Sequence, residues 1–261
     1  MPAVLIYHDI VRSGDPDAVG FAGPLAARYK LDEARFEEHL DAIAALDRRV
    51  GLVSAGDLPP DVALTFDDGG ASAMWAAASL ERRGWHGHFF VTTGKIDTPG
   101  FLTAADVRAL AEAGHSIGSH SHTHPAYMAR LPDDRLRDEW TVSRAALADV
   151  LGSAPEIAAV PGGSLSDGVL RAAEAAGFRT LMTSQPTRRS RTVGELEVIG
   201  RYTIWSTTSL GQVSGYAAGA LAPRARLWLE WTAKGAFKRV SPGFYQRARR
   251  VRARLTPRRS T

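Results

Sequence analysis

The stretch Val62-Ala63-Leu64-Thr65-Phe66-Asp67-Asp68-Gly69-Gly70 joins a short apolar run to a pair of carboxylates. Because the run follows Pro59-Pro60 and precedes two glycines, it predicts a buried parallel strand that ends in a loop. Neighbouring residues on an extended chain point in opposite directions, so one carboxylate can bind a metal ion while the other reaches a bound water. An isolated Asp-Asp-Gly more often forms a plain turn. A second motif is therefore needed.

Three histidines, at positions 120, 122 and 124, follow Ile117-Gly118-Ser119 at a second strand-to-loop transition. Imidazole and carboxylate groups are common ligands of zinc and similar divalent ions. This cluster is internal and ends at Pro125, unlike a metal-binding tag. One aspartate with two histidines leaves coordination positions open, which a catalytic metal needs in order to hold water and polarise a carbonyl. The two motifs together indicate a metal-dependent hydrolase.

These two motifs resemble the first and second motifs of the polysaccharide deacetylase family, also called the NodB homology family. The resemblance covers about residues 3–205 and includes, in the family's order, Phe89-Phe90-Val91 and Val160-Pro161-Gly162-Gly163. It implies that Asp67 is the general base and that one divalent metal ion is bound by Asp68, His120 and His124. His122 occupies a variable position of the motif. We expect zinc, while nickel, cobalt or iron would fit the same ligands.

The third motif departs from the family pattern. Many members have an arginine two residues before the proline, where it orients the base, but this chain has Ala159. The resemblance also implies that a backbone amide near Gly162 helps to hold the oxyanion, a role that needs close backbone approach. A plain loop is the alternative for Pro-Gly-Gly. The sequence therefore leaves the partner of Asp67 unassigned.

The general acid is the second departure. Many members carry it in a C-terminal Leu-x-His motif, but this chain has no histidine after His124. Val4-Leu5-Ile6-Tyr7-His8-Asp9 resembles the permuted branch of exopolysaccharide deacetylases, in which the acid histidine follows the first strand. This implies that His8 protonates the leaving amine, for which imidazole has a suitable pKa. The alternative is a strand-end histidine satisfied by local hydrogen bonds. Asp9, or a carboxylate elsewhere, is a candidate to orient the ring.

Strand-like and helix-like segments alternate along the remaining chain, which favours an α/β barrel. Apolar residues at helical spacing predict helices around 36–46, 107–111, 136–151 and 170–176. The resemblance implies a distorted (β/α)7-type barrel with seven strands, which we assign to residues 1–221. Loops at 14–29, 94–100 and 184–194 are expected to determine specificity. The absence of cysteine from all 261 residues excludes disulfides and thiolate ligands.

Residues 222–261 form a basic C-terminal extension. They contain twelve Arg or Lys and one acidic residue, whereas residues 1–221 contain twenty basic and twenty-seven acidic residues. Downstream of Trp228 and Trp231, apolar residues at helical spacing among arginines predict an amphipathic helical tail: Phe244, Ala248, Val251 and Leu255. Such a helix can pack on the barrel, or it can lie on an anionic membrane surface. No base-reading module is present, so specific nucleic-acid binding is not expected.

The sequence predicts a hydrolase of carbon-nitrogen bonds other than peptide bonds. We expect an N-deacetylase of an N-acetylated amino sugar, carried on a glycan, an exopolysaccharide, or a lipid- or nucleotide-linked sugar. Two alternatives remain open, a hydrolase of another amide and a catalytically silent glycan-binding protein. Met1-Pro2 leads directly into the first strand without a signal peptide or spanning segment. A cytoplasmic location is therefore expected, including peripheral association with the inner membrane face.

Overall fold

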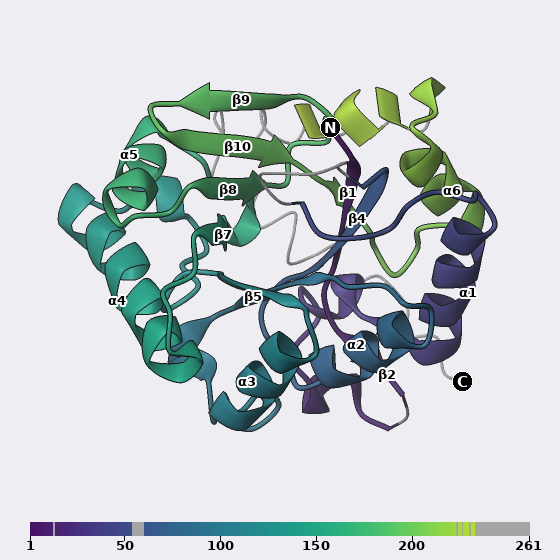
Figure 1. The fold of residues 1–261 in the computed structure, drawn as a ribbon, viewed down its shortest axis with the longest axis horizontal. Coiled ribbons are helices and arrows are strands. Elements are labelled where there is room, and N and C mark those ends of the chain that lie inside the picture. The colour runs from purple at the N-terminus through teal and green to yellow at the C-terminus, as the bar shows by residue number, and fades with distance from the viewer. Residues whose placement is uncertain (13, 54–59, 223, 226, 230, 233–261) are drawn as a thin grey trace.

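One large β-sheet forms the centre of the computed structural model, which describes residues 1–12, 14–53, 60–222, 224–225, 227–229 and 231–232 (Figure 1). Seven parallel strands form its body and follow one another across the sheet in the order β1 (Ala3–Tyr7), β4 (Val62–Phe66), β5 (His88–Val91), β6 (Ser116–Ser119), β7 (Ile157–Ala159), β8 (Thr180–Thr183) and β10 (Leu196–Gly200). Strand β11 (Tyr202–Thr203) lies parallel beside β1, and β9 (Ser190–Val193) lies antiparallel beside β10. These two edge strands do not pair within the described chain, so the barrel is open between them. The expected distorted seven-stranded α/β barrel is confirmed.

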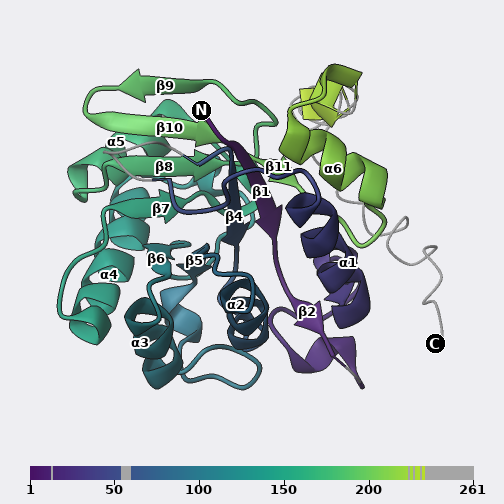
Figure 2. The same cartoon turned by 45° about the vertical axis from the view of Figure 1, so that its right-hand side comes forward.

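Helices cover the outside of this sheet (Figures 1 and 2). The α-helices of the described chain are α1 (Glu33–Ala44), α2 (Ala73–Glu81), α3 (Ala104–Glu112), α4 (Asp133–Leu151), α5 (Asp167–Ala175) and α6 (Leu210–Ala218). Helices α1 and α6 pack together near β1, whereas α3 and α4 pack against β6. Capping boxes begin two of them, with Thr103 and Asp106 at α3 and Ser209 and Gln212 at α6. Local sequence therefore sets these helix starts.

Side chains alternate between the inside and the outside of the barrel along each strand. On β1, Leu5 belongs to the large apolar cluster beneath the helices, whereas its neighbour Val4 belongs to a separate cluster. This second cluster fills the barrel interior with one residue from each of six strands: Val4, Ala63, Phe90, Ala159, Met182 and Ile199. The alternation determines which residues beyond the strand ends face the interior.

Two connections differ from simple loops. The segment expected to be a loop at 184–194 contains β9, whose residues Ser190 to Val193 pair with β10. A long segment connects β2 (Ile10–Val11) to β3 (Leu31–Asp32). These two strands pair with each other in a separate small sheet. This segment contains the short helices η1 (Pro16–Ala18) and η2 (Ala27–Tyr29). Three more short helices follow other strands or precede α4: η3 (Thr93–Lys95), η4 (Met128–Arg130) and η5 (Pro161–Gly163).

The first part of the basic extension contacts the barrel. Leu227 is buried in the large apolar cluster, and Nε of Arg224 donates to the hydroxyl of Tyr202 at 2.7 Å. Four apolar side chains nearby are exposed to solvent: Leu221 (80%), Trp228 (46%), Leu229 (62%) and Trp231 (37%). The predicted helix at 244–255 lies outside the described residues. No helix in the described part of the chain is long and apolar enough to cross a membrane.

Candidate active site

His8 and Asp67 lie at the same rim of the barrel, at the carboxyl ends of the parallel strands. They directly follow β1 and β4, whose register pairs Tyr7 with Phe66. The amide of Asp67 donates to the carbonyl of Tyr7 at 3.0 Å, which continues the pairing by one step. Alternation from Val4 on β1 and from Ala63 on β4 then turns both side chains toward the interior. The structure thus brings the first strand's histidine and the paired aspartates to one rim.

The carboxylate of Asp67 is held by Arg201, which follows β10. Nη1 donates to Oδ1 at 2.7 Å and Nη2 donates to Oδ2 at 2.9 Å. Such a bidentate pair fixes the plane of the carboxylate. Arg201 also donates to the hydroxyl of Thr65 at 3.0 Å and to the carbonyl of Thr183 at 3.3 Å. Because its side chain is only 1% exposed, these contacts fix the guanidinium inside the barrel.

Arg201 is therefore the partner of Asp67 that the sequence left unassigned. Burial alone would raise the pKa of Asp67, but the charge of Arg201, helped by His120, outweighs burial and lowers the pKa below its ordinary value. The carboxylate is thereby kept ionised and ready to accept a proton. The signal in the sequence was a single arginine within the otherwise uncharged stretch Val198-Ile199-Gly200-Arg201-Tyr202. Charged residues in such a stretch are rarely buried without a partner.

Three groups that can bind a metal ion converge beside Asp67: Asp68, His120 and His124. Their ligand atoms all lie within 4.8 Å of one another. Nε2 of His120 lies 3.4 Å, and Nε2 of His124 lies 3.2 Å, from Oδ1 of Asp68. Burial alone would raise the pKa of Asp68, but the two histidines outweigh it and hold that pKa well below its ordinary value. This donor set fits a catalytic divalent metal with open positions.

A backbone carbonyl orients the first of these histidines. Nδ1 of His120 lies 2.9 Å from the carbonyl oxygen of Ala159, which can only accept a hydrogen bond. Nδ1 therefore donates to this carbonyl, which leaves Nε2 as the ring nitrogen that faces Asp68 and would bind a metal ion. Ala159 thus contacts the site through its backbone, although its side chain cannot orient Asp67.

The histidine loop is held in an unusual backbone conformation. Asp68, Ser121 and His124 have positive φ angles of 79°, 66° and 58°. Non-glycine residues adopt this region only where surrounding contacts enforce it, and such positions cluster at functional sites. The conformation turns His124 back toward Asp68.

Glu139 on α4 helps to hold the histidine loop in this backbone conformation. Its buried carboxylate accepts hydrogen bonds from the amides of His122 at 2.9 Å and Thr123 at 2.8 Å, and from the hydroxyl of Thr123. Glu139 was not predicted from the sequence, although it lies on the buried face of its helix beside Trp140. His122 lies outside the metal-binding cluster, and its Nδ1 is 3.0 Å from the hydroxyl of Thr93.

The imidazole of His8 packs against the ring of Tyr29, with 4.4 Å between the ring centroids. Burial lowers the pKa of His8 below its ordinary value, and the negative charges of Asp68 and Asp67 oppose this shift. The Nδ1 atom of His8 is buried and makes no hydrogen bond within the described chain. Asp9, a candidate to orient the ring, accepts instead from the hydroxyl of Ser72 at 2.7 Å. Burial raises the pKa of Asp9 to about 6.

Gly162 lies in η5, in the loop after β7. Its φ of 58° is in the left-handed region that favours glycine. Its amide makes no hydrogen bond within the described part of the chain. Since Ala159 at the end of β7 contacts His120, the loop that carries Gly162 begins beside the histidine cluster.

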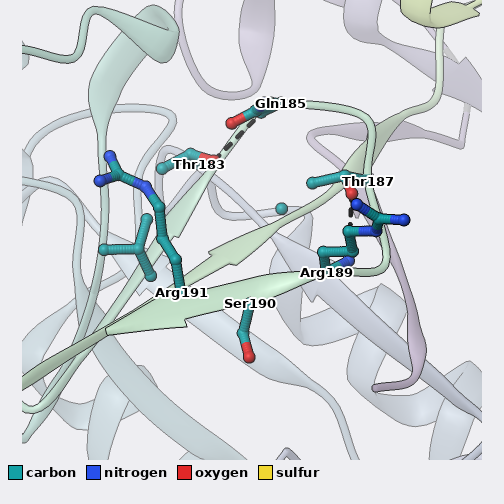
Figure 3. Close-up of a pocket in the computed structure, with 8 residues that line it drawn as sticks. Thr183, Gln185, Thr187, Arg189, Ser190 and Arg191 are labelled. Carbon is teal, nitrogen blue, oxygen red and sulfur yellow. Dashed lines mark hydrogen bonds between the residues drawn. The ribbon is translucent and has the colours of Figure 1, made fainter. Parts of the chain in front are cut away.

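An open pocket of about 270 Å³ lies between β8, β9 and β10, and its lining includes none of the metal-binding residues (Figure 3). Its lining is polar and basic: Thr183, Gln185, Thr187, Arg189, Ser190, Arg191, Val198 and Gly200. Arg189 and Arg191 are exposed there. Arg188 instead donates to the carbonyl of Met1 from two guanidinium nitrogens, at 3.0 Å and 2.9 Å.

Comparison with known proteins agrees with this geometry. The family model described as polysaccharide deacetylase matches residues 56–181. A polysaccharide deacetylase from Bacillus cereus superposes with a TM-score of 0.69 at 19% identity, over 82% of this chain and 68% of that chain. A de-N-acetylase from Aggregatibacter actinomycetemcomitans gives a TM-score of 0.68 at 19% identity, over 82% and 98% of the two chains. No curated protein sequence matches this chain.

A third solved structure, IcaB from Ammonifex degensii, is 20% identical, with a TM-score of 0.67 over 82% of this chain and 96% of that chain. At such low identities these likenesses establish the fold. The matched segment 56–181 contains the paired aspartates and the histidine cluster, which the structure brings together at one rim. Over residues 56–181, just under half of its length, this chain is therefore similar to the polysaccharide deacetylase family, and its fold is that of solved polysaccharide deacetylases.

Proposed function

We propose that this chain is a metal-dependent N-deacetylase that removes the acetyl group from an N-acetylated amino sugar in a glycan. One observation carries the proposal, namely that the bidentate Arg201–Asp67 pair lies beside the cluster of Asp68, His120 and His124. A held, ionised carboxylate next to a metal-binding set is what hydrolysis of an amide by water requires. A silent glycan-binding protein would have no use for both parts.

The residues divide the work as follows. Asp67 accepts a proton from the attacking water, and Arg201 keeps its carboxylate ionised and oriented. The amide of Gly162 donates to the oxyanion that forms on the acetyl carbonyl. His8 gives a proton to the departing nitrogen as the carbon-nitrogen bond breaks and acetate is released.

The ion expected at Asp68, His120 and His124 is zinc, although nickel, cobalt and iron suit the same donors. When bound, such an ion polarises the carbonyl and lowers the pKa of water. The protonated Nδ1 of His120, bonded to the carbonyl of Ala159, supports this assignment because ligating histidines commonly donate their second ring nitrogen in this way.

The test is acetate release from N-acetylglucosamine oligomers by the full chain, after chelation and after reloading with each metal. The matched variant is Asp67→Asn, which has the same shape but cannot accept the proton. We expect it to bind metal normally and to lose roughly 10²–10⁴-fold in kcat. Full activity in Asp67→Asn would refute the base assignment. Metal-loaded protein that cleaves cyclic or other non-sugar amides, but no N-acetylated sugar, would support the alternative hydrolase.

We also infer that the basic extension binds an anionic membrane surface. Two observations support this inference, the excess of twelve basic over one acidic residue in 222–261 and the exposure of Leu221, Trp228, Leu229 and Trp231. Tryptophan, leucine and arginine together suit the boundary between lipid head groups and acyl chains. We therefore propose a cytoplasmic enzyme at the inner membrane face, where a lipid-linked or growing glycan is the substrate.

A further inference from the structure

The rings of His8, Tyr29 and Trp205 lie one after another in a tilted stack. The centroid of Tyr29 lies 4.4 Å from that of His8, and the centroid of Trp205 lies 4.7 Å from that of Tyr29. The interplanar angles are 38° and 30°. Cζ of Arg28 lies 5.1 Å from the centroid of Trp205 and ends the stack. Tyr29 therefore lies between the imidazole and the indole.

The two loops that supply these rings are tied together. The amide of Ser206, next to Trp205, donates to the carbonyl of Arg28 at 2.9 Å. The amide of Trp205 donates to the hydroxyl of Thr208 at 2.8 Å. These bonds fix Tyr29 and Trp205 relative to each other.

The 14–30 segment that carries Tyr29 is itself anchored. Nζ of Lys30 donates to the carbonyls of Pro16 at 2.7 Å and Val19 at 2.5 Å. The buried carboxylate of Asp9 packs against Gly20, where an added Cβ would lie 2.0 Å from Oδ2 of Asp9. Residues 14–30 therefore form an anchored wall beside the site, and Tyr29 has a defined place in it.

His8 needs such a wall because hydrogen bonds do not orient its Nδ1. That atom makes no hydrogen bond within the described chain, and the adjacent carboxylate of Asp9 is bonded to Ser72 instead. By contrast, His120 is oriented through the carbonyl of Ala159. Ring packing on Tyr29, with 4.4 Å between the centroids, is a contact that restricts the plane of the His8 imidazole.

We propose that Tyr29, supported by Trp205, is the positioning residue of the general acid His8. The inference rests on the proposed function, in which His8 protonates the leaving nitrogen. As the tetrahedral intermediate collapses, the carbon-nitrogen bond breaks, its electron pair passes to nitrogen, and nitrogen takes the proton from His8. The products are acetic acid, which loses its proton to water and leaves as acetate, the free amine and a neutral imidazole. A misplaced imidazole slows this step and leaves water attack intact.

Because His8 acts only on the leaving group, two substrates with different leaving groups can test how well it is placed. An amine cannot leave as an anion near neutral pH, so an N-acetylated sugar needs the acid. The p-nitrophenolate of p-nitrophenyl acetate leaves without a proton, so that ester needs only the metal-binding set and the base. The ratio of amide to ester hydrolysis therefore measures how well the acid is placed.

The experiment compares Tyr29→Leu, Tyr29→Phe and Trp205→Leu in the metal-loaded full chain, using the chelator-sensitive rates on N-acetylglucosamine oligomers and p-nitrophenyl acetate. We expect Tyr29→Leu to lower kcat on the amide roughly 10–100-fold, because small misplacements of a catalytic group have effects of this size. KM and the ester rate should change less than about threefold, since binding and water attack do not use the acid. Tyr29→Phe keeps the ring and should restore the wild-type ratio. Trp205→Leu should lower the ratio less than Tyr29→Leu does.

Trp75 provides a matched control, because Cζ of Arg12 lies 4.9 Å from its ring centroid and it is half-buried like Trp205. Trp75→Leu should leave the ratio unchanged. An unchanged ratio in Tyr29→Leu, or equal losses on both substrates, would overturn the proposal. If Tyr29→Leu does not fold, an unchanged ratio in Trp205→Leu overturns it instead.

Two results distinguish a failure of the proposed function from a failure of this inference. Wild-type protein that hydrolyses the ester but no N-acetylated sugar contradicts the proposed deacetylase function. If wild-type protein cleaves both substrates and His8→Ala keeps the wild-type ratio, the acid lies elsewhere and the role of Tyr29 is overturned, while deacetylation stands.

Discussion

Arg201 and Asp67 form a charge pair that is buried inside the barrel. The side chains are 1% and 5% exposed, so neither charge can be solvated if the other is removed. Breaking such a pair costs more than the pair itself contributes, because an uncompensated charge is left in the interior. Removal of either side chain should therefore lower the free energy of unfolding.

Arg201→Met should lower the free energy of unfolding by about 3–5 kcal/mol, the usual cost of leaving a buried charge unpaired. The double variant Asp67→Asn/Arg201→Met should be more stable than Arg201→Met alone, since no charge remains buried. Urea unfolding of the metal-free proteins gives the free energy of unfolding of both variants. As a control, breaking the exposed Arg12–Glu33 pair, 2.8 Å apart, should cost at most about 1 kcal/mol. The single variant Asp67→Asn is measured as well. If the double variant lost the sum of the stability losses of Asp67→Asn and Arg201→Met, the two charges would not be coupled.

The sequence predicts some site residues better than others. Asp67, Asp68, His120 and His124 form short contiguous motifs whose spacing on strand-to-loop transitions is visible in one chain. Arg201 and Glu139 act through contacts between elements, so their partners depend on strand order and helix placement. Each did leave a local trace, a charged residue in a stretch that is otherwise apolar or faces the core. Such a trace indicates burial but does not identify the partner.

At the scale of elements, helix α4 positions the metal-binding loop through Glu139. Glu139→Ala should weaken binding of zinc to the full chain by roughly 10–100-fold, the usual effect of removing a group that holds metal ligands in place. The reason is that the amides of His122 and Thr123 lose their acceptor, and the positive φ of His124 loses support. Competition titration against a zinc chelator measures the change.

The control for this change is Asp138→Ala on the exposed side of the same helix, where the side chain is 61% exposed. It should leave zinc binding unchanged. If Glu139→Ala bound zinc as tightly as wild type, the loop would hold its conformation without α4.

Strand β5 carries a buried histidine that links stability to pH. Nε2 of His88 accepts the amide of Val53 at 2.9 Å, which requires an unprotonated nitrogen. Burial lowers the pKa of His88 to about 3, from 6.5 in the unfolded chain. Between these values the unfolded chain binds more protons, so the contribution to stability is present above pH 6.5 and is lost as pH falls toward 3.

His88→Gln keeps an acceptor for Val53 but cannot be protonated. As the pH is lowered from about 6.5 to about 4, its free energy of unfolding should therefore fall less steeply than that of the wild type. The two slopes should differ by up to about 1.4 kcal/mol per pH unit. Denaturant unfolding at several pH values in this window gives both slopes. The same substitution at exposed His86 is the control and should leave the slope unchanged. Parallel slopes for His88→Gln and wild type would show that His88 is not the titrating group.

Most elements were predictable because burial imposes a regular pattern. The strand at 62–66 and the helices near 36–46 and 136–151 follow apolar runs or helical spacing, and the structure has β4, α1 and α4 there. Strand β9 was missed because Ser190-Arg191-Thr192-Val193 lies at the sheet edge and is polar at three of its four positions. An edge strand with little buried surface leaves no apolar signal.

At the scale of the whole molecule, charge is divided unevenly. Residues 1–221 carry more acidic than basic residues, whereas 222–261 carry twelve basic residues and one acidic residue. The described start of the extension contacts the barrel through Leu227 and Arg224, yet Trp228 and Trp231 remain exposed nearby. An extension anchored at its start and apolar at its surface can hold an acidic body next to an anionic bilayer.

The membrane proposal predicts that the full chain sediments with vesicles of phosphatidylcholine and phosphatidylglycerol, but much less with phosphatidylcholine alone. A chain ending at Leu221 should remain in the supernatant with both. Each basic residue near an anionic surface contributes about 1 kcal/mol at physiological salt, so binding should weaken as salt rises. Trp228→Ser/Trp231→Ser keeps every charge, and because it removes only the exposed rings, it should bind more weakly and with a steeper salt dependence than wild type. If the full chain and the shortened chain both stayed in the supernatant with anionic vesicles, the extension would not be a membrane-binding element, and packing on the barrel would be its role.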